Sequence, residues 1–298
     1  MMIAELLVNA LISGLLLGGF YAAISIGLSI SFGLLDTVNI AHPTFLVLGA
    51  FLAYTLNSQA GIDPLLAGVL MTPLFFLLGL FIYSVYYQFF EKTSAEALRG
   101  LAFFFGILFI TEVGMIIAFG VDHRMVQAPY ANGSLDGSIL GMELSVPYRM
   151  LSVFVVASIM TLGLHLFFSR TFFGRASRAV HQDMLALSLM GVDPIRVKRI
   201  AFAIALATCG VGGALMIIMI PIEPAVGRLY IGNVFAIVVL GGLGSISGTL
   251  IAAVLLGVAE SVVSTFLGPS WSPAVSFGIL LGVLAFKPSG MFGVGDTR

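Results

Sequence analysis

Charged residues are scarce in this sequence of 298 residues. Asp, Glu, Lys and Arg make up 9% of the chain, whereas a soluble domain carries roughly 25%. So few charges cannot cover a water-facing surface, and this excludes a soluble globular protein. The net charge of −1 also lacks the basic footprint that nucleic-acid binding requires. Because hydrophobic residues make up 59% of the chain, the sequence indicates an integral membrane protein.

Cysteine is almost absent too. The single Cys209 lies in an apolar run, which excludes a disulfide framework and a cysteine-based metal site. His42, His123, His165 and Glu260 have no metal-ligand spacing, so we expect no metal. We see no paired carboxylates and no nucleophile arrangement typical of an enzyme. The first residues, MMIAELLVNA, lack the basic start and cleavage site of a signal peptide, and we expect them to remain as the first span.

Long apolar runs dominate what is present. A membrane-spanning helix needs about 20 apolar residues, and nine segments approach that length. They are 6–35, 38–56, 65–90, 101–121, 148–168, 200–220, 231–243, 249–267 and 274–286. The first is long enough to span with tilt or with a break near Gly18-Gly19, and the seventh is short enough to be re-entrant. We predict an all-α polytopic membrane protein of eight or nine segments, with residues 1–298 as a single domain.

One loop concentrates the positive charge. The stretch from Ser169 to Phe202 carries six of the 13 Lys and Arg residues: Arg170, Arg175, Arg178, Arg196, Lys198 and Arg199. Lys and Arg are retained on the cytoplasmic side of a membrane, so we predict that this loop is inside. Counting outward from it gives nine crossings, with the N-terminus outside and the C-terminus inside.

A short helix is predicted within this basic loop, from Asp183 to Met190. Gly191 suits the left-handed turn that ends a helix. Asp193-Pro194 then reads as a cap followed by a first-turn proline. Two interpretations stay open: a helix that docks on a cytosolic partner, or a solvated basic loop that only sets the topology.

The hydrophobic pattern breaks at Asn39-Ile40-Ala41-His42-Pro43-Thr44-Phe45. Proline removes a backbone donor and disfavours helical geometry in the preceding residue. Freed backbone groups at membrane depth are tolerated only within protein or beside a water-filled cavity. Asn39, His42 and Thr44 are therefore candidates for a translocation pathway, and the alternative is a simple helix cap at the interface.

A second break, from Gly241 to Thr249, is rich in glycine. A phosphate-binding loop requires GxxxxGK[ST], and no lysine stands near Gly248-Thr249. The sequence therefore predicts a turn between two helical segments rather than a nucleotide site, and Ser245 within it is a further pathway candidate.

Three ionisable residues fall inside predicted spans: Glu112, His165 and Glu260. Such residues are rare and often functional, whereas Asp36 and Glu223 lie at turns. No Lys or Arg falls within the hydrophobic core of a predicted span, so we expect no fixed ion pair at the midplane. Glu112 and Glu260 would then face each other, backbone donors or water. Structural hydrogen bonding and a role in the pathway both remain open for them.

Four blocks of the sequence resemble a known family. They are GLSISFGLLDTVNIAHPTFLVLGAFLAY (27–54), GRASRAVHQDMLALSLMGVDPIRVKRIAF (174–202), VLGGLGSISGTLIAAVLLGVAES (239–261) and KPSGMFG (287–293). Together they resemble the LivH-type permease subunits of branched-chain amino acid ABC importers. Two details depart from the family pattern. His42-Pro43-Thr44 replaces the more usual His-Gly-Glu, and Leu185-Ala186-Leu187 stands where ABC importers generally place an acidic residue and two alanines.

The resemblance implies an ABC importer permease fold of the LivH/LivM type in the prokaryotic plasma (inner) membrane. It further implies a second, LivM-like permease, two cytosolic ATP-binding subunits that hold ATP and Mg²⁺, and a soluble substrate-binding protein. The basic loop, at about 169–199, would couple the permease to the ATPase. The matching positions are Arg175, Arg178, Asp183, Gly191 and Arg196. This chain itself would bind no cofactor.

The expected solute is a branched-chain or related amino acid. Related permeases serve urea, short amides or small aromatic acids, so these remain alternatives. From another class, a proton-coupled secondary transporter would use Glu112 or Glu260 as a relay, and a passive channel would need no energy source. The basic loop with its short helix favours the ATP-driven importer over both.

Overall fold

The computed structural model describes residues 2–35, 39–91, 96–126, 128, 130, 132–139, 142–287 and 290–292. The predicted turn at Asp36-Thr37 and the cation Lys92 lie outside the described residues, as do Pro288, Ser289 and Gly293 of the last family block.

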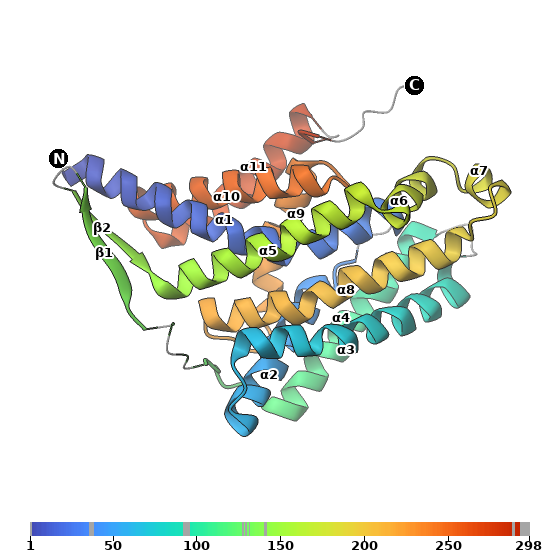
Figure 1. Ribbon diagram of the computed structural model, residues 1–298, viewed down its shortest axis with the longest axis horizontal. Coiled ribbons are helices and arrows are strands. Elements are labelled where there is room, and N and C mark those ends of the chain that lie inside the picture. Colours follow the sequence, from blue (N-terminus) through green and yellow to red (C-terminus); the bar gives the residue numbers. More distant parts are fainter. Residues whose placement is uncertain are drawn as a thin grey trace.

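Helices account for most of the described chain (Figure 1). The bundle consists of α1 (Met2–Leu35), α2 (His42–Ala60), α3 (Pro64–Tyr86), the π-helical turn η1 (Tyr87–Glu91), α4 (Glu96–Phe119), α5 (Tyr148–Arg170), α6 (Phe172–Gln182), α7 (Met184–Leu189), α8 (Pro194–Met219), α9 (Gly227–Gly241), α10 (Ile246–Leu267), the 3₁₀ turn η3 (Pro269–Trp271) and α11 (Ser272–Phe286). Seven of these, α1, α3, α4, α5, α8, α10 and α11 (the last together with η3), are long and apolar enough to cross a membrane. The chain is therefore a multi-pass membrane protein, as the sequence predicts.

A small β-hairpin interrupts the helices, in the polar segment between α4 and α5. Strand β1 (Ser134–Ile139) pairs antiparallel with β2 (Met142–Pro147), with Ser134 opposite Pro147. The Asn9 side chain of α1 donates a hydrogen bond to the Glu143 carbonyl of β2, at 2.9 Å. The start of α1 and the hairpin consequently share one end of the bundle, on the left of Figure 1.

The opposite end gathers α6, α7 and the C-terminal residues. Met291 donates its backbone N–H to the carbonyl of Leu240 at the end of α9, at 2.8 Å. Leu187 of α7 packs in a small hydrophobic cluster with Ile26 and Ile30 of α1. The first residues of α1 and the last described residues, 290–292, thus lie at different ends of the bundle (Figure 1).

Helices α1 and α8 form the buried centre of the bundle, and small residues let their neighbours come close. A Cβ at Gly18 of α1 would lie 2.6 Å from the Cα of Val254 in α10, and one at Gly213 of α8 would lie 2.3 Å from the carbonyl oxygen of Leu46 in α2. Close approach through small residues is how helices associate in lipid. Helix α1 runs unbroken through Gly18-Gly19, so its length is accommodated without a kink there.

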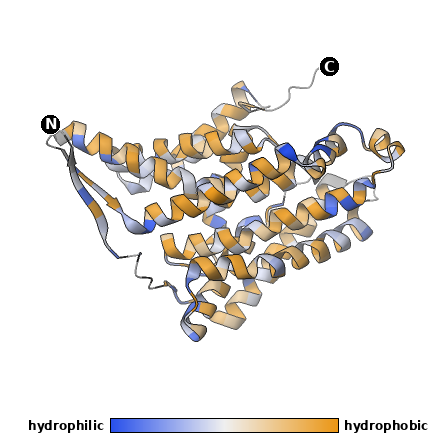
Figure 2. Cartoon of the chain, viewed as in Figure 1, coloured by the Kyte–Doolittle hydropathy of each residue, from blue (hydrophilic) through white to orange (hydrophobic). Residues whose placement is uncertain are grey.

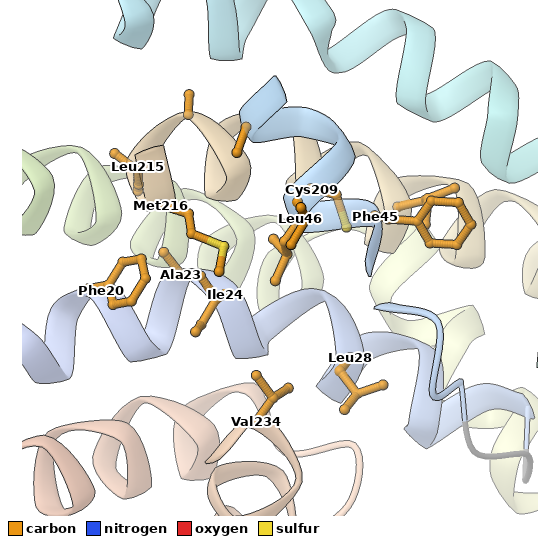
Figure 3. Close-up of a cluster of buried hydrophobic side chains, with 14 of the residues drawn as sticks. Phe20, Ala23, Ile24, Leu28, Phe45, Leu46, Cys209, Leu215, Met216 and Val234 are labelled. Atoms are coloured by element: carbon orange, nitrogen blue, oxygen red, sulfur yellow. The ribbon is translucent and has the colours of Figure 1, made fainter. Parts of the chain in front are cut away.

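Of the helices that correspond to the nine predicted segments, α2 and α9 fall outside the spanning class. The first residue of each, His42 and Gly227, is buried in the bundle. A Cβ on Gly227, the first residue of α9, would lie 3.2 Å from the backbone of Pro43 in the first turn of α2. The first turns of these helices therefore meet. Figure 3 shows the apolar core beside them, to which α2 contributes Phe45 and Leu46, α1 contributes Ile24 and Leu28, and α9 contributes Val234. The prediction of discontinuous segments is consistent with this junction.

Candidate functional site

The start of α2 is built by Asn39 and Pro43. The Asn39 side-chain oxygen accepts a hydrogen bond from the Ala41 backbone N–H at 3.2 Å, closing a turn before the helix. Pro43 occupies the first turn of α2, where its missing N–H would lack an intrahelical partner anyway. Because Asn39, Ala41 and His42 are all buried, this helix start lies in the interior of the protein.

The polar side chains at this start are buried and point inward. His42 Nε2 lies 3.2 Å from the carbonyl oxygen of Ile24 in α1, and His42 Nδ1 lies 3.6 Å from Cys209 Sγ in α8. Thr44 and Asn39 are buried as well. The pathway candidates Asn39, His42 and Thr44 are thus buried at the start of α2, where His42 links this helix to α1 and α8.

Glu112 of α4 makes a bidentate salt bridge with Arg228 of α9. Arg228 Nε donates to Glu112 Oε2 at 2.9 Å, and Arg228 Nη2 donates to Glu112 Oε1 at 2.6 Å. The expectation that Glu112 would form no fixed ion pair is therefore wrong. The predicted segment began at Ile231 and left Arg228 in a loop, whereas α9 begins at Gly227, so Arg228 lies in its first turn.

The two partners of this ion pair are unequally buried. The Glu112 side chain is 6% exposed, and that of Arg228 is 49% exposed. The Arg228 guanidinium carbon also lies 5.2 Å from the centre of the Phe109 ring, a cation–π arrangement. A charged side chain within a membrane-spanning bundle faces water or protein rather than lipid. The exposed side of Arg228 therefore marks a face of the chain that water or another subunit covers.

Glu260 of α10 is held by neutral donors from three other helices. Its carboxylate accepts hydrogen bonds from the Tyr21 hydroxyl of α1 at 2.5 Å, from the Asn233 amide of α9 at 3.2 Å, and from the Ser276 hydroxyl of α11. Hydrogen bonding within the bundle, one of the two interpretations left open, is what the structure shows. Glu112 and Glu260 do not face each other, since each has its own partners.

The glycine-rich break is a turn between α9 and α10, as predicted. Gly242 and Gly244 have positive φ angles of 94° and 77°, which favour glycine. Ser245 caps α10, because its Oγ accepts the Gly248 N–H at 3.1 Å. His165 lies near this turn, with its Nδ1 3.4 Å from Ser247 Oγ. These residues occupy the end of the bundle that carries α6 and α7, away from the α2–α9 junction.

The predicted short helix in the basic loop is α7. Its ends form as predicted: the Asp183 side chain accepts the Ala186 N–H at 2.9 Å, and Gly191 adopts a left-handed φ of 80°. Asp193 then caps α8, whose first residue is Pro194. Preceding α7, α6 is strongly amphipathic and begins with Thr171 accepting the Gly174 N–H.

The cations of this loop have different surroundings. Arg178 donates to the Phe168 carbonyl at the end of α5, at 2.7 Å. Arg196 pairs with Asp193 at 3.0 Å, and Arg175 is exposed. Helix α7 itself projects from the bundle, at the right of Figure 1. Figure 2 shows apolar colour on α7 although it projects, and the Leu189 side chain is 81% exposed.

Sequence reasoning missed the residues that satisfy the buried carboxylates. Arg228, Asn233, Tyr21 and Ser276 come from helices distant in the sequence, and none belongs to a recognisable motif. One signal was present: Arg228 directly precedes an apolar run and follows the last Pro of its loop, so it could have been assigned to the helix rather than to the loop.

Comparisons with known proteins agree over almost the whole chain. The profile of a family described as "Branched-chain amino acid transport system / permease component" matches residues 10–284. The high-affinity branched-chain amino acid transport system permease protein BraD of Pseudomonas aeruginosa is 29% identical over 295 residues, which is 95% of this chain and 94% of that protein.

The permease protein LivH of Salmonella typhimurium is also 29% identical, over 94% of each chain. LivM of Escherichia coli, another permease protein of such a system, is 25% identical over 91% of this chain and 67% of its own length. No solved structure matches the chain. Because the family profile covers nearly every helix of the bundle, this chain belongs to the family of permease components of branched-chain amino acid transport systems.

Proposed function

We propose that this chain is the permease subunit of an ATP-driven importer for a branched-chain or related amino acid. The observation that carries the proposal is the family match from residue 10 to residue 284, which includes the segment that forms α7. The relatives are named for branched-chain amino acid transport, and this supports the solute class.

The energy for transport comes from partner subunits. The chain has no nucleotide motif, so ATP and Mg²⁺ belong to two cytosolic ATP-binding subunits. A second, LivM-like permease and a substrate-binding protein complete the assembly in the prokaryotic plasma membrane. Helix α7 supports this arrangement, because a projecting helix with exposed Leu185, Leu189 and Met190 suits a groove on a partner. Asp183 and Gly191 fix its two ends. Arg175 and Arg178 lie in α6, which precedes α7, and Arg196 lies in the first turn of α8, which follows it.

The solute passes the α2–α9 junction on the side where Arg228 is exposed. Discontinuous membrane helices present the positive ends of their dipoles to anionic groups of a substrate. Arg228 in the first turn of α9 adds a full positive charge there, and Glu112 balances it. Such a balanced pair would attract the carboxylate of an amino acid weakly, which suits a site that must also release it. Glu260 is held by its own hydrogen bonds and Ser245 caps α10, so we assign neither to this route.

The first test is biochemical. We would purify the chain from its native membrane in mild detergent, identify the co-purifying proteins by mass spectrometry, and measure uptake of labelled leucine into proteoliposomes. Two ATP-binding subunits, a second permease and ATP-dependent uptake are expected. Uptake by the chain alone along a proton gradient would replace the proposal with a secondary transporter. Flux without any energy source would indicate a channel, and transport of urea in place of leucine would change the solute.

A matched pair of variants tests the role of α7. Leu189→Asp places a charge on its exposed apolar face and should lower ATP-dependent uptake at least about tenfold, the effect of losing one interface anchor. Leu135→Asp changes an exposed leucine of β1 at the opposite end of the bundle and should leave uptake unchanged. Equal uptake by wild type and Leu189→Asp would refute docking through α7.

A further inference from the structure

A groove runs between α3 and α8 near the end of the bundle that carries α6 and α7. It consists of two adjoining hollows, of about 380 Å³ and about 520 Å³. Ser84 and Arg199 line both hollows, which makes the groove continuous. The remaining lining residues are Phe76, Leu80, Tyr83, Tyr87, Gln88, Ile195 and Ile200.

The groove is polar at one end and apolar at the other. Phe76, Leu80, Ser84 and Gln88 follow one another at intervals of four residues, so they form one stripe along α3 and its continuation η1. Gln88 lies nearest the end of the bundle, and Phe76 lies roughly 12 Å deeper than Ser84 at 1.5 Å per residue. This order matches an amphiphile that lies parallel to the helices with its polar head at the end of the bundle.

Arg199 is the charged group of the groove. It lies in the second turn of α8 and is half-buried. Within the described part of the chain it has neither an ion-pair partner nor a hydrogen bond. Guanidinium groups recognise phosphate through several donors at once. A half-buried guanidinium that lacks a partner at the edge of a membrane domain therefore suits a phosphate from outside the chain.

The remaining polar lining supports an anionic ligand. No residue that lines the groove is acidic, so an ammonium group would find no carboxylate partner there. The exposed Gln88 amide can donate beside Arg199. The Ser84 hydroxyl already donates its hydrogen to the Leu80 carbonyl oxygen, at 2.6 Å. It therefore has no hydrogen left to donate to a ligand.

The walls of the groove are held by close helix packing. A Cβ at Gly79 of α3 would lie 2.6 Å from the Cα of Ala203 in α8. One turn further along, the rings of Tyr83 and Phe202 lie 5.9 Å apart. Because the helices cannot approach further at these points, the groove exists before any ligand enters it.

We propose that the α3–α8 groove binds one anionic phospholipid. Its phosphate contacts Arg199 and Gln88, and one acyl chain lies along Phe76, Leu80 and Ile200. The site is separate from the α2–α9 junction, and it does not depend on which solute the protein transports.

Lipid retention in native mass spectrometry tests the proposal. We would place the purified protein in nanodiscs of phosphatidylglycerol and phosphatidylcholine in equal amounts, release it into detergent and count the bound lipids. Wild type should retain one phosphatidylglycerol. Arg199→Gln should reduce that retention about fivefold, the effect of one basic residue at an anionic surface. The matched control, Arg170→Gln, removes an exposed cation outside the groove at the same end and should retain the lipid as wild type does.

A second variant separates the groove from a general charge effect. Ile200→Trp keeps Arg199 but fills the apolar part, so retention should fall while the fold, measured by circular dichroism, is preserved. Inorganic phosphate at millimolar concentration should not displace the lipid. The proposal is overturned if Arg199→Gln retains phosphatidylglycerol normally, if phosphatidylcholine is retained equally well, if phosphate alone competes, or if another subunit covers the groove in the assembled transporter.

Discussion

Glu112 and Glu260 are both buried carboxylates in the same bundle, yet the protein satisfies them in different ways. Glu112 is neutralised by one cation, Arg228. Glu260 is surrounded by the neutral donors of Tyr21, Asn233 and Ser276. A buried charge needs a partner charge or several hydrogen bonds. This chain therefore stabilises one buried carboxylate with an ion pair and the other with neutral hydrogen-bond donors.

Helix α9 supplies a partner to each of the two buried carboxylates. It supplies Arg228 to Glu112 and, about a turn and a half later, Asn233 to Glu260. This half-length helix is therefore attached to α4 on one side and to α1, α10 and α11 on the other. The contact with α4 is an ion pair, whereas the contact with Glu260 is made by a neutral amide. Substitutions at the two contacts should therefore lower the stability of the protein by different amounts.

The largest expected effect is that of removing Arg228. Arg228→Gln leaves Glu112 buried without a partner, and breaking such a pair costs about 3 kcal/mol, the low end of the usual range because Arg228 is half exposed. The midpoint of thermal unfolding in detergent should fall accordingly. Glu112→Gln should cost less, since the half-exposed Arg228 can still reach water. A larger loss in Glu112→Gln than in Arg228→Gln would contradict this account.

Removal of the Glu260 carboxylate should have an intermediate effect. Glu260→Ala leaves the buried Tyr21 and Ser276 hydroxyls and the Asn233 amide without their acceptor, which costs about 2 kcal/mol. Glu260→Gln is the control, because it retains one acceptor oxygen and should lose about half as much. Thermal unfolding of the two variants in the same detergent checks the order. Unchanged stability in Glu260→Ala would mean that the network contributes nothing.

The smallest expected effect concerns the ring beside the ion pair. Phe109→Leu removes the cation–π contact with Arg228 and should cost about 0.5–1 kcal/mol. A double-mutant cycle with Arg228→Gln should show that this cost disappears once the cation is absent. Phe81→Leu serves as the control, because Phe81 is an exposed phenylalanine of α3 that contacts no cation among the described residues. Additive losses in the cycle would show that Phe109 acts through packing alone.

Local chemistry explains which parts of the fold the sequence predicts well. The ends of α7 depend on Asp183 and Gly191, which act within one helical turn of their own positions, and both form as predicted. Pro194 at the start of α8 is likewise a local signal. The start of α9 has no such signal: its N-cap position, Val226, makes no side-chain cap hydrogen bond. The predicted segment consequently began four residues late and left Arg228 outside it.

The sequence by itself determined the membrane class, the order of the helical segments and the short helix in the basic loop, because hydrophobic length and helix caps are properties of neighbouring residues. Only the tertiary structure decided the partners of the buried carboxylates and the meeting of α2 with α9. Glu112 and Arg228 are 116 positions apart, and Tyr21 and Glu260 are 239 apart. Contacts between residues so far apart in the sequence depend on how the whole bundle packs, and no local sequence pattern encodes them.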